Sequence, residues 1–141
     1  SEGRGTTRPF EIIGAPFILA EALANHMNNL GLPGVRFRPV WFTPTFSKHA
    51  GALCGGVQIH VTDREAYLPF RTGLSLLKAI HDLHPQAFRF GPGTLPFFDK
   101  LAGNGWIRQG IEEGESVDAM EARWAPELRS FEEVRRRYLL Y

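Results

Sequence analysis

The chain has 141 residues, of which 43% are hydrophobic and 22% charged, and its formal net charge at pH 7 is +1. This balance is typical of a soluble globular domain, and the near-zero charge argues against a nucleic acid or an anionic membrane as partner. No apolar run approaches the roughly 18 residues of a membrane span. The single Cys54 excludes an intrachain disulfide framework and a Cys-cluster zinc site.

The chain opens on a dense polar segment, Ser1–Phe10, in which one carboxylate and two guanidinium groups lie within eight residues. Its glycines allow the backbone to turn tightly and a ligand to approach it closely. Such a segment normally connects two structural elements, so we expect this chain to be a fragment in which residues 1–10 form a junction. The alternative is a disordered start, as chain termini often are.

Beyond this segment, the periodicity of apolar residues alternates between that of strands and that of helices. The predicted elements, in chain order, are a short strand within 1–14, a helix over 16–30, strands over 35–43 and 54–62, a helix over 72–84, a loop or short strand over 86–97, helical pieces near 98–102 and 104–110, and a helix from 116 to about 138. We interpret the whole of 1–141 as one domain, since the chain shows no internal repeat, linker or low-complexity run.

Particular residues set the expected ends of these elements. Pro16 suits the first position of a helix, and Gly31 suits its end. Thr72 is expected to cap the helix that Pro85 stops. Pro39 argues that its strand lies at a sheet edge or carries a bulge.

The last helix is predicted to bury an apolar stripe and to be broken or kinked at Pro126. The stripe consists of Val117, Met120, Trp124, Leu128, Phe131 and Val134. The charged residues between them, Glu132, Glu133 and Arg135–Arg137, are expected to form a solvated face with pairs one helical turn apart.

Aromatic residues surround the Thr43-Pro44-Thr45 loop. Trp41, Phe42 and Phe46 could stack on sugar rings, although plain core packing is the commoner use of any one aromatic. Trp41 and Phe42 point to opposite faces if they lie on a strand.

The histidines and the cysteine give weaker signals. His81 and His84 lie three residues apart on a predicted helix, but no carboxylate-rich partner accompanies them, so we expect no metal site and no cofactor. Cys54 has no evident catalytic partner and is expected to be a small buried thiol. His49, in the polar loop, is the histidine best placed to contact a ligand.

Several longer motifs together resemble the C-terminal part of the bacterial exo-β-N-acetylmuramidases, a family of peptidoglycan-degrading glycoside hydrolases formerly listed as a domain of unknown function. The resemblance runs in order through Ser1–Glu11, Gly14–Phe17, Gly34–Phe37, Phe42–Phe46, Cys54–Asp63 and Tyr138–Tyr141. It covers essentially the whole chain, and several ordered motifs are far more specific than one short pattern.

The resemblance implies an α+β fold: a small mixed sheet with packed helices and a long C-terminal helix. It further implies that this domain follows a larger N-terminal Rossmann-like domain, absent here, with the active cleft between the two. The implied activity is removal of terminal N-acetylmuramic acid from peptidoglycan fragments. The implied location of the parent protein is the periplasm or the exterior of a bacterium, with the cytoplasm not excluded.

The resemblance also suggests roles for individual residues. Because the principal catalytic glutamate of the family is expected in the missing domain, Glu2 would be a second carboxylate or an anchor for the neighbouring arginines. Arg4 and Arg8 would grip the lactyl carboxylate of muramic acid, since a guanidinium fork suits a carboxylate. The remaining predicted contacts to the sugar are Thr6, Thr7, Thr43, Thr45 and His49. The alternative for Glu2 and Arg4 is a structural pair.

Two other functions stay open at this point. One is a non-catalytic saccharide-binding or interdomain module that uses the aromatic and threonine residues of 41–49. The other, which we consider weaker, is an independent hydrolase that uses Cys54 with a histidine.

Overall fold

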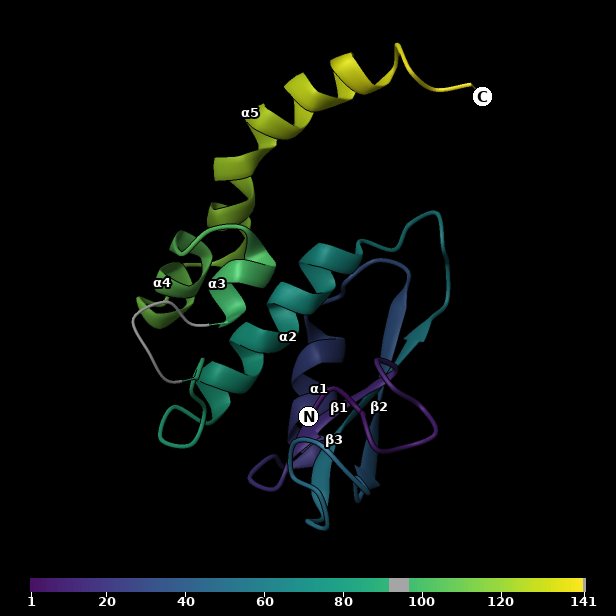
Figure 1. Cartoon of the computed structure of the whole chain (residues 1–141), viewed down its shortest axis with the longest axis vertical. Helices are drawn as coiled ribbons and strands as arrows, with labels where there is room; N and C mark the ends of the chain where they lie inside the picture. Colours follow the sequence, from purple (N-terminus) through teal and green to yellow (C-terminus); the bar gives the residue numbers. More distant parts are fainter. Residues whose placement is uncertain (92–96, 141) are drawn as a thin grey trace. The chain divides into compact units, whose positions relative to one another are not determined.

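The computed structural model describes residues 1–91 and 97–140, so the predicted loop or strand at 86–97 lies partly outside the described residues. The chain divides into two compact units, Ser1–Arg89, here called the sheet unit, and Phe90–Tyr141, the helical unit (Figure 1). Among the described residues, no helix is both long and apolar enough to cross a membrane.

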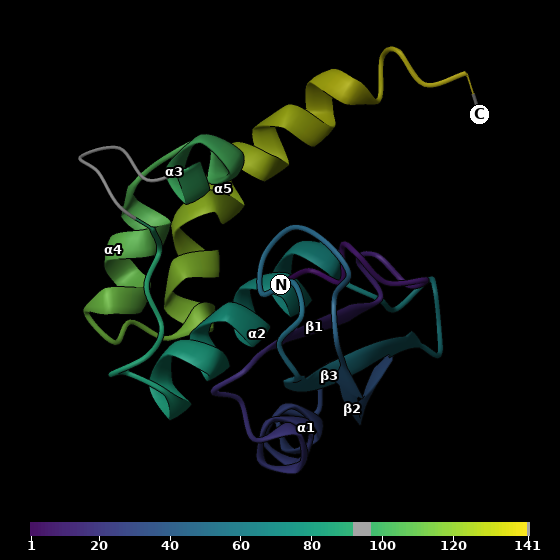
Figure 2. The same cartoon turned by 60° about the horizontal axis from the view of Figure 1, so that its bottom comes forward.

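The sheet unit contains three strands and two helices (Figures 1 and 2). They are β1 (Ile12–Ala15), α1 (Ala20–Asn29), β2 (Val35–Phe42), β3 (Cys54–Val61) and α2 (Pro69–Leu83). The strand order is β1-β3-β2, and both pairings are antiparallel, so the expected sheet is present but is antiparallel rather than mixed. The edge position predicted from Pro39 is confirmed, because β2 pairs only with β3 among the described strands.

One face of the sheet shares a hydrophobic core with both helices. Val57 of the central strand and Phe37 of β2 pack in this core with Met27 of α1 and Ile80 of α2. The sheet residues of the core share one face, since the register pairs Val57 with Pro39 and Phe37 with Ile59. Burying this face provides the main driving force for folding of the unit.

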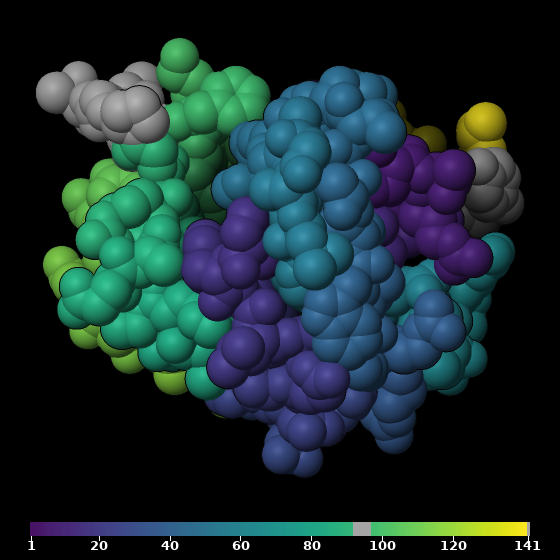
Figure 3. All heavy atoms as spheres, turned by 90° about the horizontal axis from the view of Figure 1, so that it is seen from below, coloured from purple at the N-terminus to yellow at the C-terminus, as the bar shows by residue number. Residues whose placement is uncertain are grey.

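The opposite face of the sheet is also buried, at Ile12, Cys54 and Gln58. The segment Ser1–Phe10 lies here, because a Cβ atom on Gly3 would stand 2.8 Å from the Ile12 side chain. Figure 3 shows this purple N-terminal segment at the surface, beside the blue loop that joins β2 to β3. The segment is therefore ordered against the sheet, and the alternative of a disordered start is wrong.

The first helix begins later than predicted, at Ala20 instead of Pro16. Residues 16–19 form a turn in which the Ile18 amide donates to the Ala15 carbonyl oxygen, and Ile18 is buried. The Ile18 carbonyl oxygen also lies so close to Gly55 that a side chain there would collide with it. Packing of this turn against the sheet thus overrides the preference of Pro16 for a helix start. The predicted end at Gly31 is confirmed, with a positive φ of 64°.

The second helix begins at Pro69, earlier than the predicted start at Thr72. Pro69 takes the first-turn position that proline favours. The prediction of Thr72 as a cap is wrong: Thr72 lies within α2 and is buried. Leu68 stands at the N-cap position and offers no side-chain hydrogen bond. The predicted end at Pro85 is confirmed, since α2 ends at Leu83.

The helical unit contains α3 (Phe97–Ala102), α4 (Trp106–Glu112) and α5 (Val117–Arg135), close to the predicted positions. Asp99 of α3 is buried and accepts hydrogen bonds from Arg108 of α4, with a shortest distance of 2.9 Å. Ser116 caps α5 by accepting from the Ala119 amide. The long C-terminal helix is therefore confirmed, and it continues through Pro126 with a change of direction visible in Figure 1.

The predicted burial of the α5 stripe is wrong for most of its length. Met120 is fully buried, but Leu128, Phe131 and Val134 are exposed. The pairs expected among Glu132, Glu133 and the arginines do not form within the described part of the chain. Within the helical unit, no described neighbour covers the C-terminal half of α5. Sequence periodicity shows which side of a helix is apolar but not whether another element covers it.

Candidate functional site

The segment Ser1–Phe10 owes its shape to backbone hydrogen bonds and two left-handed glycines. The Gly14 amide donates to the Ser1 carbonyl oxygen at 2.9 Å, and the Phe10 amide donates to the Glu2 carbonyl oxygen at 2.7 Å. Gly3 and Gly5 have φ values of 77° and 80°, in the region that other residues rarely adopt. The segment is thus a closed loop, here called the junction loop, that returns to its starting point before β1.

The junction loop is fastened to the loop that joins β2 to β3. The Thr45 amide and hydroxyl both donate to the Gly5 carbonyl oxygen, at 2.8 and 3.0 Å. A Cβ atom on Gly5 would stand only 2.5 Å from the Phe46 carbonyl oxygen. Only glycine allows this close approach between the two loops.

Two of the predicted substrate-binding threonines use their hydroxyl protons within the loops. Thr6 donates to the Gly3 carbonyl oxygen at 2.6 Å and accepts from the Arg8 amide at 3.1 Å. Thr45 donates to Gly5, as described above. Their hydroxyl groups therefore hold the loops in shape, while Thr43 is exposed.

Glu2 lies between two cations, with its side chain 27% exposed. One carboxylate oxygen is 3.2 Å from Arg4 Nε, and the other is 3.4 Å from Lys48 Nζ. Partial burial alone would raise the pKa of Glu2, but its backbone hydrogen bond, Lys48 and Arg4 together lower the pKa below its usual value. Glu2 is accordingly a carboxylate at neutral pH.

The two arginines of the junction loop differ in their contacts. Arg4 pairs with Glu2 and also lies over the Phe10 ring, 5.6 Å from its centroid. Arg8 is exposed and makes no ion pair within the part of the chain that the structure describes. Of the two cations, only Arg8 is left to meet an external anion without giving up a partner.

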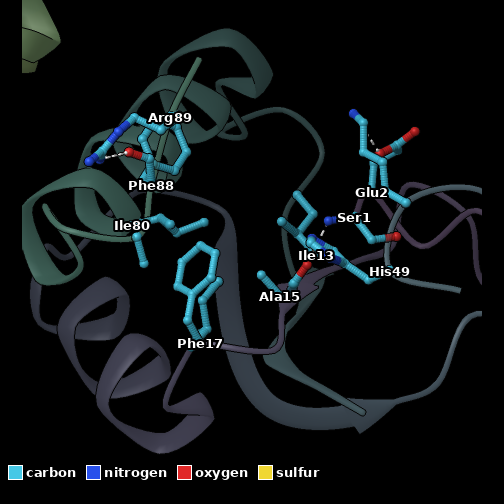
Figure 4. A pocket seen from close by; sticks show the side chains of 13 residues that line it. Ser1, Glu2, Ile13, Ala15, Phe17, His49, Ile80, Phe88 and Arg89 are labelled. Carbon is cyan, nitrogen blue, oxygen red and sulfur yellow. Dashed lines mark hydrogen bonds and ion pairs between the residues drawn. The ribbon is translucent and has the colours of Figure 1, made fainter. Parts of the chain in front are cut away.

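Glu2 stands at the rim of a hollow of about 340 Å³. Figure 4 shows Glu2, Ser1 and His49 at one end, Phe17 and Ile80 along the wall, and Phe88 with Arg89 at the other end. The full lining is Ser1, Glu2, Ile13, Gly14, Ala15, Phe17, Ile18, Lys48, His49, Ile80, Ala87, Phe88 and Arg89. A mostly apolar hollow with a few polar groups at its ends is the usual form of a small-molecule site.

Lys48 and His49 bring the second loop into the polar end of this hollow. His49 holds a φ of 62°, as Ser47 does at 70°, and both values are unusual for residues with side chains. Burial lowers the pKa of His49, and the positive charges of the Ser1 amino terminus and of Lys48 lower it further. Its imidazole is therefore neutral at neutral pH and can both donate and accept a hydrogen bond.

The structure thus brings together only part of the predicted site. Glu2 and His49 line the hollow, whereas Arg4, Thr6, Arg8, Thr43 and Thr45 do not. Sequence reasoning missed Lys48 and the apolar wall of Phe17, Ile80 and Phe88. The only sequence signal that Lys48 belongs to the site was its place beside His49 in a polar loop. Its contact with Glu2 could not be predicted, because the two residues lie 46 positions apart in the chain.

The described residues offer no metal centre and no accessible thiol. No group of three or more His, Cys, Asp or Glu side chains in the described ranges could hold a metal ion. His81 instead pairs with Asp82 at 3.0 Å. Cys54 is fully buried, as predicted, and burial raises the pKa of its thiol, which disfavours the thiolate that catalysis would need.

The aromatic residues near 41–49 divide between surface and interior. Trp41 and Phe46 are 53% and 63% exposed. Phe42 is half-buried, with its ring over Gly14. Two exposed aromatic rings of this size are large enough to stack on a sugar.

Comparison with known proteins gives consistent matches over this whole chain. The family model described as "Exo-beta-N-acetylmuramidase NamZ, C-terminal" matches residues 1–141. The chain is 55% identical, over 142 aligned residues, to the peptidoglycan beta-N-acetylmuramidase NamZ of Bacillus subtilis strain 168, covering all of this chain and 34% of that protein. It is also similar to the crystal structure of a DUF1343 family protein from Bacteroides fragilis, with a TM-score of 0.89 and 27% identity, covering 99% of this chain and 37% of that one. The chain therefore spans about a third of the length of each relative.

Proposed function

Because the chain belongs to the family of C-terminal domains of NamZ exo-β-N-acetylmuramidases, we propose that it is the C-terminal part of a glycoside hydrolase that removes terminal N-acetylmuramic acid from peptidoglycan fragments. The observation that carries this proposal is the 55% identity, across the entire chain, to a protein named for that activity. The charged end of the hollow at Glu2 is where this chain would meet the sugar.

The proposed active unit includes a larger N-terminal Rossmann-like domain. Glycoside hydrolysis commonly needs two positioned carboxyl groups, and Glu2 is the only carboxylate among the described residues that line the hollow. The second carboxyl group would come from the other domain, with the cleft between the two. This chain alone is then expected to be inactive.

Within this cleft, Glu2 would act as a charged carboxylate. A general acid for glycoside cleavage needs a raised pKa, whereas the pKa of Glu2 is lowered by its surroundings. The direction of this shift favours a base, a nucleophile or an electrostatic partner of the developing positive charge. The general acid is accordingly assigned to the absent domain.

The other charged and polar groups would bind the sugar. Arg8, which lies outside the lining of the hollow, would bind the lactyl carboxylate. This role is supported by the fit of a guanidinium group to a carboxylate and by the absence of an ion pair to Arg8 in the described structure. His49 would hydrogen-bond a hydroxyl or N-acetyl group from the polar end of the hollow. Arg4, Thr6, Thr43 and Thr45 would support the two loops or contact more distant parts of the substrate.

We propose a periplasmic or secreted location for the parent protein, since peptidoglycan fragments are released from a wall that lies outside the cytoplasm. The peptidoglycan-acting relative is bacterial. Fractionation of the native host, with immunodetection of the full-length protein, tests this location.

The test of function is release of the chromophore from an aryl β-N-acetylmuraminide. Activity is expected from the full-length protein and not from the 141-residue chain. In the full-length protein, Glu2→Gln should lower kcat by about a hundredfold or more, because a positioned carboxylate commonly contributes that much. Glu11→Gln is the matched control, since Glu11 is an exposed neighbour in sequence that lines no part of the hollow. Equal activity of both variants would remove Glu2 from the mechanism.

A second candidate function is a saccharide-binding module without a catalytic role. The exposure of Trp41 and Phe46 favours it. In that case Trp41→Ala would weaken the binding of muropeptides to the full-length protein, as measured by calorimetry. Glu2→Gln would leave turnover unchanged. The earlier alternative of a Cys54 hydrolase is not proposed, since the thiol is fully buried.

A further inference from the structure

Within the helical unit, the C-terminal half of α5 has no covering partner among the described residues. Every residue from Pro126 to Leu140 is exposed. The N-terminal half of the same helix is packed, with Met120 fully buried and Arg123 lying 4.1 Å over the Trp106 ring. Pro126 marks the change from the packed half to the uncovered half.

The uncovered half nevertheless carries an apolar stripe. Leu128, Phe131 and Val134 recur every three residues, so they lie on one side of the helix. Their exposed fractions are 51%, 60% and 48%. The chain continues beyond them with the exposed Tyr138, Leu139 and Leu140. A contiguous apolar surface of this kind marks a contact site.

A helix end of this length also needs support from packing. Residues 127–135 follow Pro126, which lacks the amide for one helical hydrogen bond and so weakens their coupling to the packed half of α5. The helix is therefore expected to gain its order from a surface that receives the stripe.

We propose that the Leu128–Phe131–Val134 stripe packs in cis against the N-terminal remainder of the longer polypeptide and so fastens the helical unit to it. This inference rests on the proposed function only in its premise that the chain works within a longer protein. The premise follows the relatives, of which this chain covers 34% and 37%. About two thirds of each relative thus lies outside the matched region and can supply the receiving surface.

A second copy of the chain fits the stripe less well. A stable interface between separate proteins commonly uses about 20–30 residues on each side, many more than this stripe offers. A contact within one polypeptide needs less, because a covalent link gives it an effective concentration in the millimolar range. The small size of the stripe therefore favours the intramolecular partner.

Hydrogen–deuterium exchange of peptides from 127–140 in the full-length protein tests the proposal. Phe131→Asp should speed exchange of these amides by about tenfold or more, because it places a charge in the contact. Ser130→Asp is the matched control, since it adds the same charge at the neighbouring exposed position and should leave exchange within about twofold. Phe131→Leu, which keeps an apolar side chain, should retain protection even if the aspartate variant folds poorly.

Three outcomes would overturn the proposal. The first is that 127–140 exchanges in the full-length protein as fast as in the 141-residue chain by itself, which holds the sheet unit but not the proposed receiving surface. The second is that Ser130→Asp and Phe131→Asp have the same effect, and the third is that protection falls on dilution together with a dimer-to-monomer change in light scattering. None of these readouts involves substrate. Protection of 127–140 without muramidase activity would thus sustain this contact while the proposed function fails.

Discussion

At the scale of single residues, Glu2 owes its charge state to groups that lie far apart in sequence. Lys48 approaches it from the loop between β2 and β3, and Arg4 approaches it from the junction loop itself. Burial of the carboxylate raises its pKa and both cations lower it, and the net effect is a lowered pKa. Glu2 is therefore held as an anion beside a hollow, which is the arrangement that a base, a nucleophile or an electrostatic partner requires.

This lowered pKa predicts a pH-dependent contribution to stability. A carboxylate with a depressed pKa in the folded state stabilises the fold above the unfolded-state pKa, and this stabilisation disappears as the pH falls through the folded-state value. Glu2→Gln should thus lower the Tm at pH 7, and the difference from wild type should vanish on acidification below about pH 4. The loss at pH 7 should stay under about 1 kcal/mol, because Arg4 and Lys48 are solvent-exposed and screened.

Thermal unfolding followed by circular dichroism from pH 3 to pH 7 measures this difference. Glu11→Gln serves as the control for loss of one exposed carboxylate. A Tm difference between wild type and Glu2→Gln that is unchanged down to pH 3 would show that the ion pairs of Glu2 do not stabilise the fold.

At the scale of elements, the junction loop and the β2–β3 loop form one surface through Gly5. Its carbonyl oxygen accepts two hydrogen bonds from Thr45, and its missing side chain leaves room for the Phe46 backbone. The site at Glu2 is therefore assembled by contact between two loops, each of which would be mobile without the other. The C-terminal half of α5 shows the converse case, an element that no described part of the helical unit covers.

The loop contact predicts unequal costs for two glycine substitutions. Gly5→Ala should lower the free energy of unfolding by about 2–4 kcal/mol, since it adds a steric clash to the strain of a positive φ. Gly51→Ala, in the same surface, has a φ of 76° but no atom near the added Cβ, so it should lower the free energy of unfolding by only about 1–2 kcal/mol. Urea unfolding of both variants provides the comparison, and equal losses would contradict tight packing at Gly5.

At the scale of the whole molecule, the chain consists of two compact units, whereas we predicted one domain over 1–141. All buried residues of the main hydrophobic cluster lie within the sheet unit. The described residues that line the site hollow also belong to that unit. Whether the chain folds as one domain stays a prediction.

The closed core of the sheet unit predicts that residues 1–89 fold without the helical unit. The expected result is a cooperative thermal transition and dispersed amide signals in an NMR spectrum of this fragment, because its core is complete. A fragment of residues 90–141 is the natural counterpart, with far fewer buried side chains. A non-cooperative transition for 1–89 would mean that the two units depend on one another and that the single-domain prediction is right.

The sequence by itself determined the local features of this protein. Gly31, Pro85 and Ser116 mark helix ends correctly, because a left-handed glycine, a proline and a capping hydroxyl act through the few residues beside them. The alternation of Val35 and Phe37 likewise located a strand and its buried face, and Pro39 indicated its edge position. The resemblance of the ordered motifs to a family added the α+β fold and the proposed function.

Tertiary structure decided what depends on contacts between distant residues. The start of α1 moved because Ile18 packs against the sheet, and Lys48 joined Glu2 across 46 residues of chain. The α5 stripe has the periodicity of a buried face along its whole length, yet only Met120 is fully buried, since burial requires a partner surface as well as a pattern. Periodicity shows which side of an element is suited to burial, and the three-dimensional arrangement alone determines whether anything covers it.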